Sequence, residues 1–199
     1  MSYPKFFDTV ETIKVRDRLL SILGGSKRGE YEFTYLDVVK SAGHSCPAVA
    51  GAYLITLEAM KILYPNEPVV RGDVKVEFKE SLTDGVRGVI ANVVTQITGA
   101  TDKSGFKGLN GNHARHSLMY FDADIGSQAR FTRVDSGKSV DVSYDPSCVK
   151  PDSAMQPLMQ KVMQGVATSE ESKEFGKLWQ DRVRRILENS ASVINVVEV

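Results

Sequence analysis

The sequence predicts an α+β fold in which an antiparallel sheet packs against a central apolar helix, with additional C-terminal helices. Three observations predict it. Residues 49–63 are apolar on nearly every face, which is typical of a helix covered on most sides. Short β-rich stretches fill residues 70–144, with connections too short for crossovers. Helical periodicity returns after residue 155, and this order of elements indicates an α+β domain.

The first half of the chain carries two helical patterns. Apolar residues recur at helical spacing over residues 6–23, and Gly24-Gly25 supplies a stop, so we expect a helix there. Residues 33–39 are apolar and β-rich, and they fit either a short strand or a turn of helix. The central helix over 49–63 ends at Tyr64-Pro65-Asn66, and Gly51 lets another backbone approach it closely.

The middle of the chain predicts the sheet. Residues 70–78 alternate as one strand, and residues 86–97 form an apolar stretch long enough for a central strand. A glycine-rich loop over 98–112 follows. Further strands are expected at 117–121, 129–134 and 139–144, in antiparallel meander order.

The C-terminal part predicts helices after a linker. Residues 145–153 contain two prolines and Cys148, and a helix is expected over 155–166. Thr168 and Glu171 form a capping-box pattern that begins the last helix. The tail from Ser190 is expected to be a short strand or a dimer-contact segment. We therefore expect a core domain over 1–145 and a helical extension over 146–199.

Composition restricts the function classes. The chain has 199 residues, 42% of them hydrophobic and 25% charged, which suits one main domain with a real core. A formal net charge of zero argues against nucleic acid as the main partner, because phosphate binding needs a basic surplus. No apolar run reaches the length of a membrane span.

Compartment is predicted from the N-terminus and the cysteines. Residues 1–15 lack the apolar core of a signal peptide. Two cysteines do not make a disulfide framework, and they indicate reduced thiols in a cytoplasm. Pairing of Cys46 with Cys148 stays open at this point.

The chemistry is concentrated in Gly43-His44-Ser45-Cys46-Pro47, which opens the central helix. Pro47 fits the first helical turn, so Cys46 is expected at the N-cap, where unpaired N–H groups favour a thiolate. Thiolate and neutral imidazole both bind divalent metals, zinc above all. The alternative is a small buried cysteine that packs as a hydrophobe, with His44 bonded to backbone.

Other candidates are less specific. His113, at the end of the glycine-rich loop, is the candidate third metal ligand, and an exposed polar residue is its alternative. Asp37 is a candidate partner for the His44 ring, and Tyr53 is an acid–base candidate. The loop itself either holds a phosphate or carboxylate or is a long connection. Its candidate cofactor-binding residues are Gly99, Gly105, Lys107 and Gly108.

At these motifs the chain resembles the FmdE-like proteins, a family of formylmethanofuran dehydrogenase subunits. Its members carry Gly-His-x-Cys-Pro at the start of a helix, here Gly43 to Pro47, and a later Thr-Gly with a glycine-rich continuation, here Thr98-Gly99 with Gly105 to Gly108. The resemblance covers residues 30–135. It implies an α+β core, a metal-binding pair at His44 and Cys46, and association with a molybdenum or tungsten enzyme that fixes carbon dioxide onto methanofuran.

The chain departs from many relatives at three points. Ala48 stands where many have glycine, and Ala100 stands where many have cysteine, which removes a third sulfur ligand. The four-cysteine zinc ribbon that some relatives append is absent, because the chain has only two cysteines.

Three functions are compatible with these features. The first is a cytoplasmic zinc-binding protein acting on a small one-carbon or pterin-like molecule, with His113 or water completing the metal shell. The second is a non-catalytic accessory protein that delivers a metal or cofactor to partner enzyme subunits. The third is a metal-free thiol enzyme with Cys46 as nucleophile and His44 as base. We expect a homodimer, because the tail 193–199 and the apolar central helix both need cover.

Overall fold

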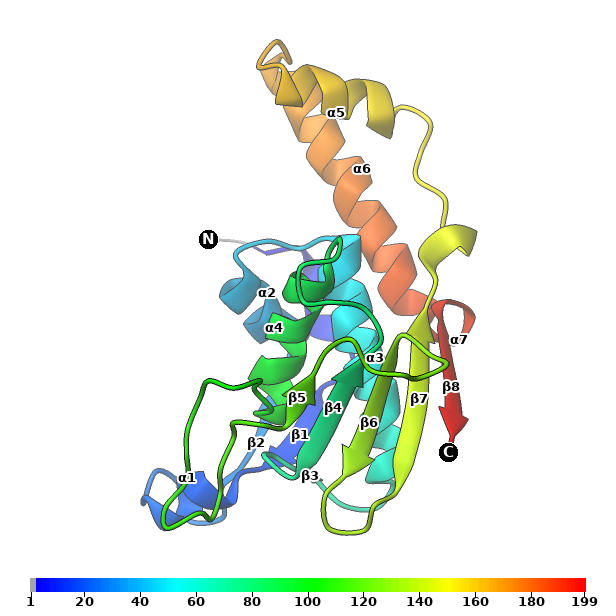
Figure 1. Cartoon of the computed structure of the whole chain (residues 1–199). Coiled ribbons are helices and arrows are strands. Elements are labelled where there is room, and N and C mark those ends of the chain that lie inside the picture. The colour runs from blue at the N-terminus through cyan, green and yellow to red at the C-terminus, as the bar shows by residue number, and fades with distance from the viewer. Residues whose placement is uncertain (1–2) are drawn as a thin grey trace.

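The computed structural model describes residues 3–199, and its centre is helix α3 (Pro47–Leu63). This helix lies between a five-stranded sheet and a group of other helices (Figure 1). Most of its side chains are buried, including Val49, Tyr53, Leu54 and Met60. The absence of a polar face along 49–63 therefore reflects cover on all sides, as the sequence predicts.

The five-stranded sheet has the order β5-β4-β6-β7-β8. Its neighbours pair antiparallel, except that β4 and β5 run parallel. Helix α3 contacts β6, β7 and β8. The α+β fold is confirmed, whereas a pure meander is wrong at β5, because α4 and the glycine-rich loop intervene between β4 and β5. The strands are β4 (Val74–Phe78), β5 (Met119–Tyr120), β6 (Ala129–Arg133), β7 (Ser139–Tyr144) and β8 (Ile194–Glu198).

The helix predicted over residues 6–23 is wrong. The segment forms a 3-10 turn, η1 (Lys5–Thr9), strand β1 (Ile13–Arg16) and the short helix α1 (Arg18–Ile22). Ile13 and Val15 are buried on alternate positions of the strand, and Asp17 caps α1 by accepting from two backbone N–H groups. The apolar residues fit a helical period by number, but a strand pattern and a capping aspartate lie inside the run.

A smaller sheet has the order β2-β1-β3 and is formed by β1, β2 (Glu30–Phe33) and β3 (Val69–Val70). Strand β2 leads directly into α2 (Tyr35–Ala42), so the ambiguous stretch 33–39 holds the end of a strand and most of a helix. The strand predicted over 70–78 is divided, since β3 and β4 belong to different sheets. The break lies at Gly72, where the backbone has φ +92° and the guanidinium of Arg115 packs against it.

The strand predicted over residues 86–97 is also wrong, because this segment is helix α4 (Arg87–Thr98). Ile90, Val93, Val94 and Ile97 are buried and share one helical face. Packing against α3 and α2 overrides the β propensity of these branched residues. Gly99 ends the helix in the left-handed conformation, with φ +78°.

The C-terminal helices are confirmed. They are α5 (Met155–Met163), α6 (Ser169–Glu188) and the short α7 (Ser190–Val193), preceded by the 3-10 turn η2 (Pro146–Cys148). The capping box of Thr168 and Glu171 is present as predicted. The chain then returns to the sheet as β8, so the tail is a strand.

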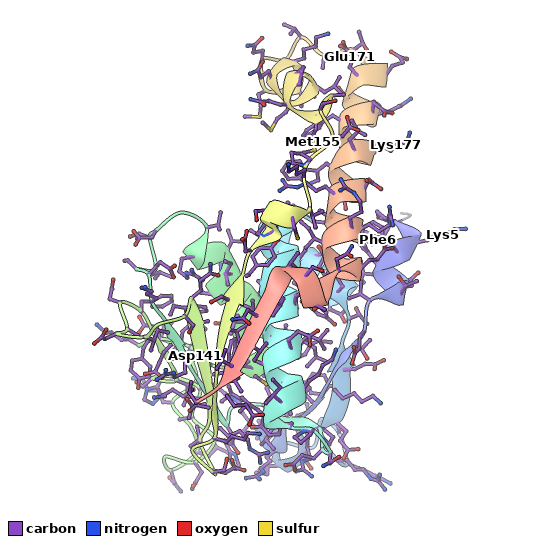
Figure 2. The ribbon with its side chains drawn as sticks, turned by 90° about the vertical axis from the view of Figure 1, so that its right-hand side faces the viewer. Lys5, Phe6, Asp141, Met155, Glu171 and Lys177 are labelled. Carbon is purple, nitrogen blue, oxygen red and sulfur yellow. The ribbon has the colours of Figure 1, made fainter. Side chains whose placement is uncertain are left out.

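The two halves of helix α6 pack against different parts of the molecule. Its C-terminal half packs on α3 through the buried residues Val183, Ile186 and Leu187. Its N-terminal half pairs with α5 and extends beyond the body of the molecule (Figures 1 and 2). Figure 2 shows Met155, Glu171 and Lys177 on this projection. We call residues 155–177 the arm.

Within residues 3–199, no helix combines the length and the apolar character that crossing a membrane requires.

Candidate metal site

The candidate site is the loop 43–47 that joins α2 to α3. Gly43 ends α2 with φ +76°, a conformation that glycine adopts without strain. Pro47 is the first residue of α3, and Cys46 is its N-cap, as predicted. The Cys46 Sγ accepts the backbone N–H of Val49, with an S···N distance of 3.4 Å. The sulfur therefore lies at the positive end of a seventeen-residue helix.

His44 lies on the surface of the same loop with its ring fixed by the backbone. Its Nδ1 is 3.0 Å from the carbonyl oxygen of Ala42. Because a carbonyl oxygen only accepts, Nδ1 carries the proton in this contact and the neutral ring keeps its lone pair on Nε2. A hydrogen bond of this kind commonly orients a metal-binding histidine.

Four side chains from other elements hold this loop in place. The Ser45 carbonyl oxygen accepts from Trp179 Nε1 at 2.9 Å and from Gln180 Nε2 at 3.1 Å, both on α6. The Ser45 hydroxyl is 3.0 Å from the Tyr35 hydroxyl on α2. Tyr144, at the end of β7, donates its hydroxyl to the Pro47 carbonyl oxygen at 2.8 Å. Helix and sheet thus fix the loop from several sides.

The two tyrosines also set the local electrostatics. Burial raises the pKa of both Tyr35 and Tyr144 far above the ordinary tyrosine value. The hydrogen bond with Ser45 partly offsets this increase in the pKa of Tyr35, and Arg182 partly offsets it for Tyr144. Both hydroxyls therefore stay protonated at neutral pH and place neutral O–H dipoles beside the cysteine.

The structure does not bring His113 to His44 and Cys46. The glycine-rich loop lies beside α1, away from the end of the molecule where α3 begins (Figure 1). It is anchored there by Arg115, which donates to Asp17 at 2.7 Å. No cluster of three or more His, Cys, Asp or Glu residues able to share a metal ion occurs between residues 3 and 199.

The glycines of that loop have structural explanations. Gly105 and Gly108 have φ +107° and φ +91°, and a Cβ at either would lie within 2.5 Å of a neighbouring atom. Gly99 caps α4, and Lys107 is exposed. Binding of a phosphate or carboxylate by this loop stays a prediction.

The remaining sequence candidates lie elsewhere. The Asp37 carboxylate accepts from the N–H and hydroxyl of Thr34 in a capping box at the start of α2, whereas His44 follows the end of that helix and bonds the Ala42 carbonyl oxygen instead. Tyr53 donates to the Glu11 carbonyl oxygen at 2.7 Å and ties α3 to the N-terminal segment. Cys148 is exposed and contacts the Ser192 carbonyl oxygen. Cys46 and Cys148 are both free thiols, which settles the pairing left open by the sequence.

Sequence reasoning missed the residues that hold the loop, namely Tyr35, Tyr144, Trp179 and Gln180. Trp179 is the chain's one tryptophan, and its spacing assigns it to the apolar stripe of the last helix. Its indole N–H needs a partner when partly buried. That need is the one available signal, but the sequence does not identify a partner 134 positions away.

Comparison with known proteins assigns the family. No curated protein matches the chain. The family model described as "FmdE, Molybdenum formylmethanofuran dehydrogenase operon" matches residues 42–195. This match begins just before the His-Cys loop and includes the C-terminal helices, so it extends beyond the resemblance over 30–135. Because the match covers well over half of the sequence, the chain belongs to the FmdE family.

Proposed function

We propose that the chain binds a divalent metal ion, zinc in the first instance, through His44 Nε2 and Cys46 Sγ. One observation carries the proposal: backbone hydrogen bonds orient both donors. The bond from His44 Nδ1 leaves Nε2 free, and the Val49 N–H bond to Cys46 Sγ leaves further sulfur lone pairs for a metal. The donor chemistry suits zinc, since imidazole nitrogen and thiolate sulfur are its preferred ligands. Water or a partner's group completes the shell, because His113 lies elsewhere.

A metal held by two protein ligands keeps open positions and supplies Lewis-acid chemistry to a bound molecule. The chain's own residues contribute a rigid loop and neutral hydroxyl groups near the sulfur. The family description supports a role in formylmethanofuran dehydrogenase-type one-carbon metabolism. The two free thiols suit a reducing, cytoplasmic location. Service as an accessory protein that passes the metal or a cofactor to partner enzyme subunits fits the same site.

Metal content after anaerobic reconstitution tests the proposal. The parent protein is expected to retain near-stoichiometric zinc after desalting, and Cys46→Ser and His44→Ala are expected to lose it. Cys148→Ser is the matched control, because it removes the other thiol without touching the loop. A parent protein that holds no zinc, iron or nickel would exclude the metal hypothesis.

The second candidate function is thiol chemistry at Cys46. The observation that favours it is the Val49 N–H bond to the sulfur at the start of a long helix, a setting that stabilises a thiolate. His44 is the base candidate, because its Nδ1 donates to the Ala42 carbonyl oxygen and its lone pair stays on Nε2. Labelling of Cys46 that chelators leave unchanged would support this function over metal binding.

We also propose a homodimer formed through the tail. Helix α3 is covered within one chain, so it gives the dimer no support. Strand β8 is an edge of the sheet, and Val197 and Val199 are 51% and 59% exposed. An open edge with apolar side chains favours pairing with a second copy. Light scattering on the parent and on Val197→Lys tests this, and a parent that is monomeric at high concentration contradicts it.

A further inference from the structure

A small cavity lies directly beside His44, between the end of α2 and the middle of α4. Its volume is about 140 Å³. That is smaller than a pocket for a drug-sized ligand, so it suits a very small molecule or the end group of a larger one. The residues that line it are Ser41, Ala42, His44, Val89, Asn92, Val93 and Gln96.

One face of α4 supplies the opposite wall. Val89, Asn92, Val93 and Gln96 are three or four positions apart, which places them on one helical face. Val93 is buried and makes an apolar floor. Asn92 is exposed at the rim. The Gln96 Nε2 donates to the Asp37 carbonyl oxygen at 3.2 Å, so this amide is oriented and keeps Oε1 as an acceptor.

The charge of the residues that line the cavity indicates which class of ligand it can bind. Among residues 3–199, no lysine, arginine, aspartate or glutamate lines it, and Lys40, in the same turn of α2, is not among its walls. Ser41 and Ala42 come from the last turn of α2, where the carbonyl end of the helix dipole disfavours anions. The polar groups offered are carboxamides, a hydroxyl and an imidazole, which provide donors and acceptors together.

We propose that this cavity binds an uncharged carboxamide group, in preference to a carboxylate of the same shape. A carboxamide presents an N–H to the acceptors and a carbonyl oxygen to the donors, and its substituent covers Val93. This inference deepens the proposed function, because it names the class of ligand that the His44 site receives. The ligand group then lies next to the Nε2 of His44, where the proposed metal ion binds.

Titration of the ¹⁵N-labelled, metal-free full chain with acetamide and with acetate tests the proposal. These two probes share shape and size and differ in charge and in the N–H donor. Acetamide is expected to shift the signals of His44, Asn92, Val93 and Gln96 in a saturable way, and acetate is expected to shift them much less. Equal responses to both probes, or no saturable response to acetamide, would overturn the proposal.

Variants localise the binding. Asn92→Ala is expected to weaken acetamide binding about fivefold, the effect of one neutral hydrogen bond. Asn66→Ala, an exposed asparagine outside the cavity, is the control and should leave the affinity unchanged. Both positions are exposed, and the spectrum of each variant reports its fold. An Asn92→Ala affinity equal to that of the parent would contradict this placement.

The test of the carboxamide proposal can be distinguished from the test of the metal proposal. Cys46→Ser removes the proposed sulfur ligand and changes no residue that lines the cavity, so it is expected to lose zinc and to retain acetamide binding. If the chain binds acetamide but never holds zinc, the carboxamide proposal is supported and the metal proposal is rejected. If the chain holds zinc but shows no response to acetamide, the carboxamide proposal is rejected and the metal proposal is supported.

Discussion

Trp179 donates its indole N–H to the carbonyl oxygen of Ser45 at 2.9 Å, across 134 positions of the chain. Ser45 lies between the two proposed metal ligands, so a helix of the C-terminal region fixes the geometry of a loop from the first quarter of the sequence. This contact explains why the C-terminal helices belong to the functional unit, and the family match includes them as well.

Trp179→Phe keeps an aromatic ring and removes the indole donor. We expect the free energy of unfolding to fall by about 1 kcal/mol, the usual net contribution of one hydrogen bond. Urea denaturation measures the change. Gln180 still donates to the same oxygen, so the loop should keep its position in this variant.

Trp179→Phe combined with Gln180→Leu is expected to lose zinc affinity as well. An unchanged zinc affinity in the double variant would show that the loop needs no support from α6.

Gly51→Ala and Gly176→Ala form a matched pair inside two helices. A Cβ at Gly51 would lie 2.3 Å from Cε1 of the Tyr144 ring, whereas a Cβ at Gly176 meets nothing within 4 Å. Gly51→Ala is expected to destabilise the fold by about 1–3 kcal/mol through overpacking. Gly176→Ala is expected to stabilise it by up to about 1 kcal/mol, since alanine favours helix. Thermal unfolding of both variants gives the sign of each change in stability. Two stability changes of the same sign would refute this explanation of Gly51.

Asp135 gives a pH-dependent contribution to stability. Hydrogen bonds from Arg133 lower its pKa to about 2 from an ordinary 3.8. A lowered folded-state pKa stabilises the fold above the ordinary value, and this contribution is lost as the pH falls from about 4 towards about 2. The carboxylate is 46% exposed, so solvent screening holds the contribution below about 1 kcal/mol.

Asp135→Asn is therefore expected to be slightly less stable than the parent at pH 7. The difference should shrink as the pH falls below about 4 and vanish only below about 2, the folded-state pKa of Asp135, where both side chains are uncharged. Chemical denaturation at a series of pH values measures it. Asp124→Asn, at an exposed position, is the control, because it also removes one carboxylate but leaves Arg133 and Asp135 in place. A difference that persists unchanged at pH 2 would show that the effect is not electrostatic.

Zinc is expected to protect Cys46 from alkylation and to leave Cys148 reactive. Cys148 is exposed and Cys46 is partly buried, so Cys148 should also react first in the metal-free protein. A bound thiolate is unavailable as a nucleophile, which is the basis of the protection. Mass spectrometry after brief iodoacetamide treatment, with and without zinc, measures both sites. Equal protection of the two cysteines would indicate a general change in the fold instead of a site at Cys46.

The sequence predicts best where the signal is local. The N-cap position of Cys46 follows from the neighbouring proline, and the capping box of Thr168 and Glu171 follows from spacing alone. The central helix is evident because apolar residues on every face require cover. These features depend on residues within a few positions of one another, so the local chain determines them.

Prediction fails where distant packing decides between two local preferences. Valine and isoleucine favour strands in general, yet α4 buries them at helical spacing against α3. At the candidate site, the proline and cysteine spacing identifies the loop, but nothing local identifies Tyr144 or Trp179 as its supports. His113 follows from its place beside glycines, and only the fold shows that its loop is anchored at Asp17.

The order of the strands has a consequence for how the protein is made. Strand β8 is the last element of the chain, and it completes the sheet beside β7 after the whole arm has been synthesised. Trp179 and Gln180, which hold Ser45, also come late. Ser45 precedes Trp179 by 134 positions, so the His-Cys loop gains this support only after α6 has been synthesised. During translation the two proposed ligands are therefore present before the side chains of α6 that fix the loop between them.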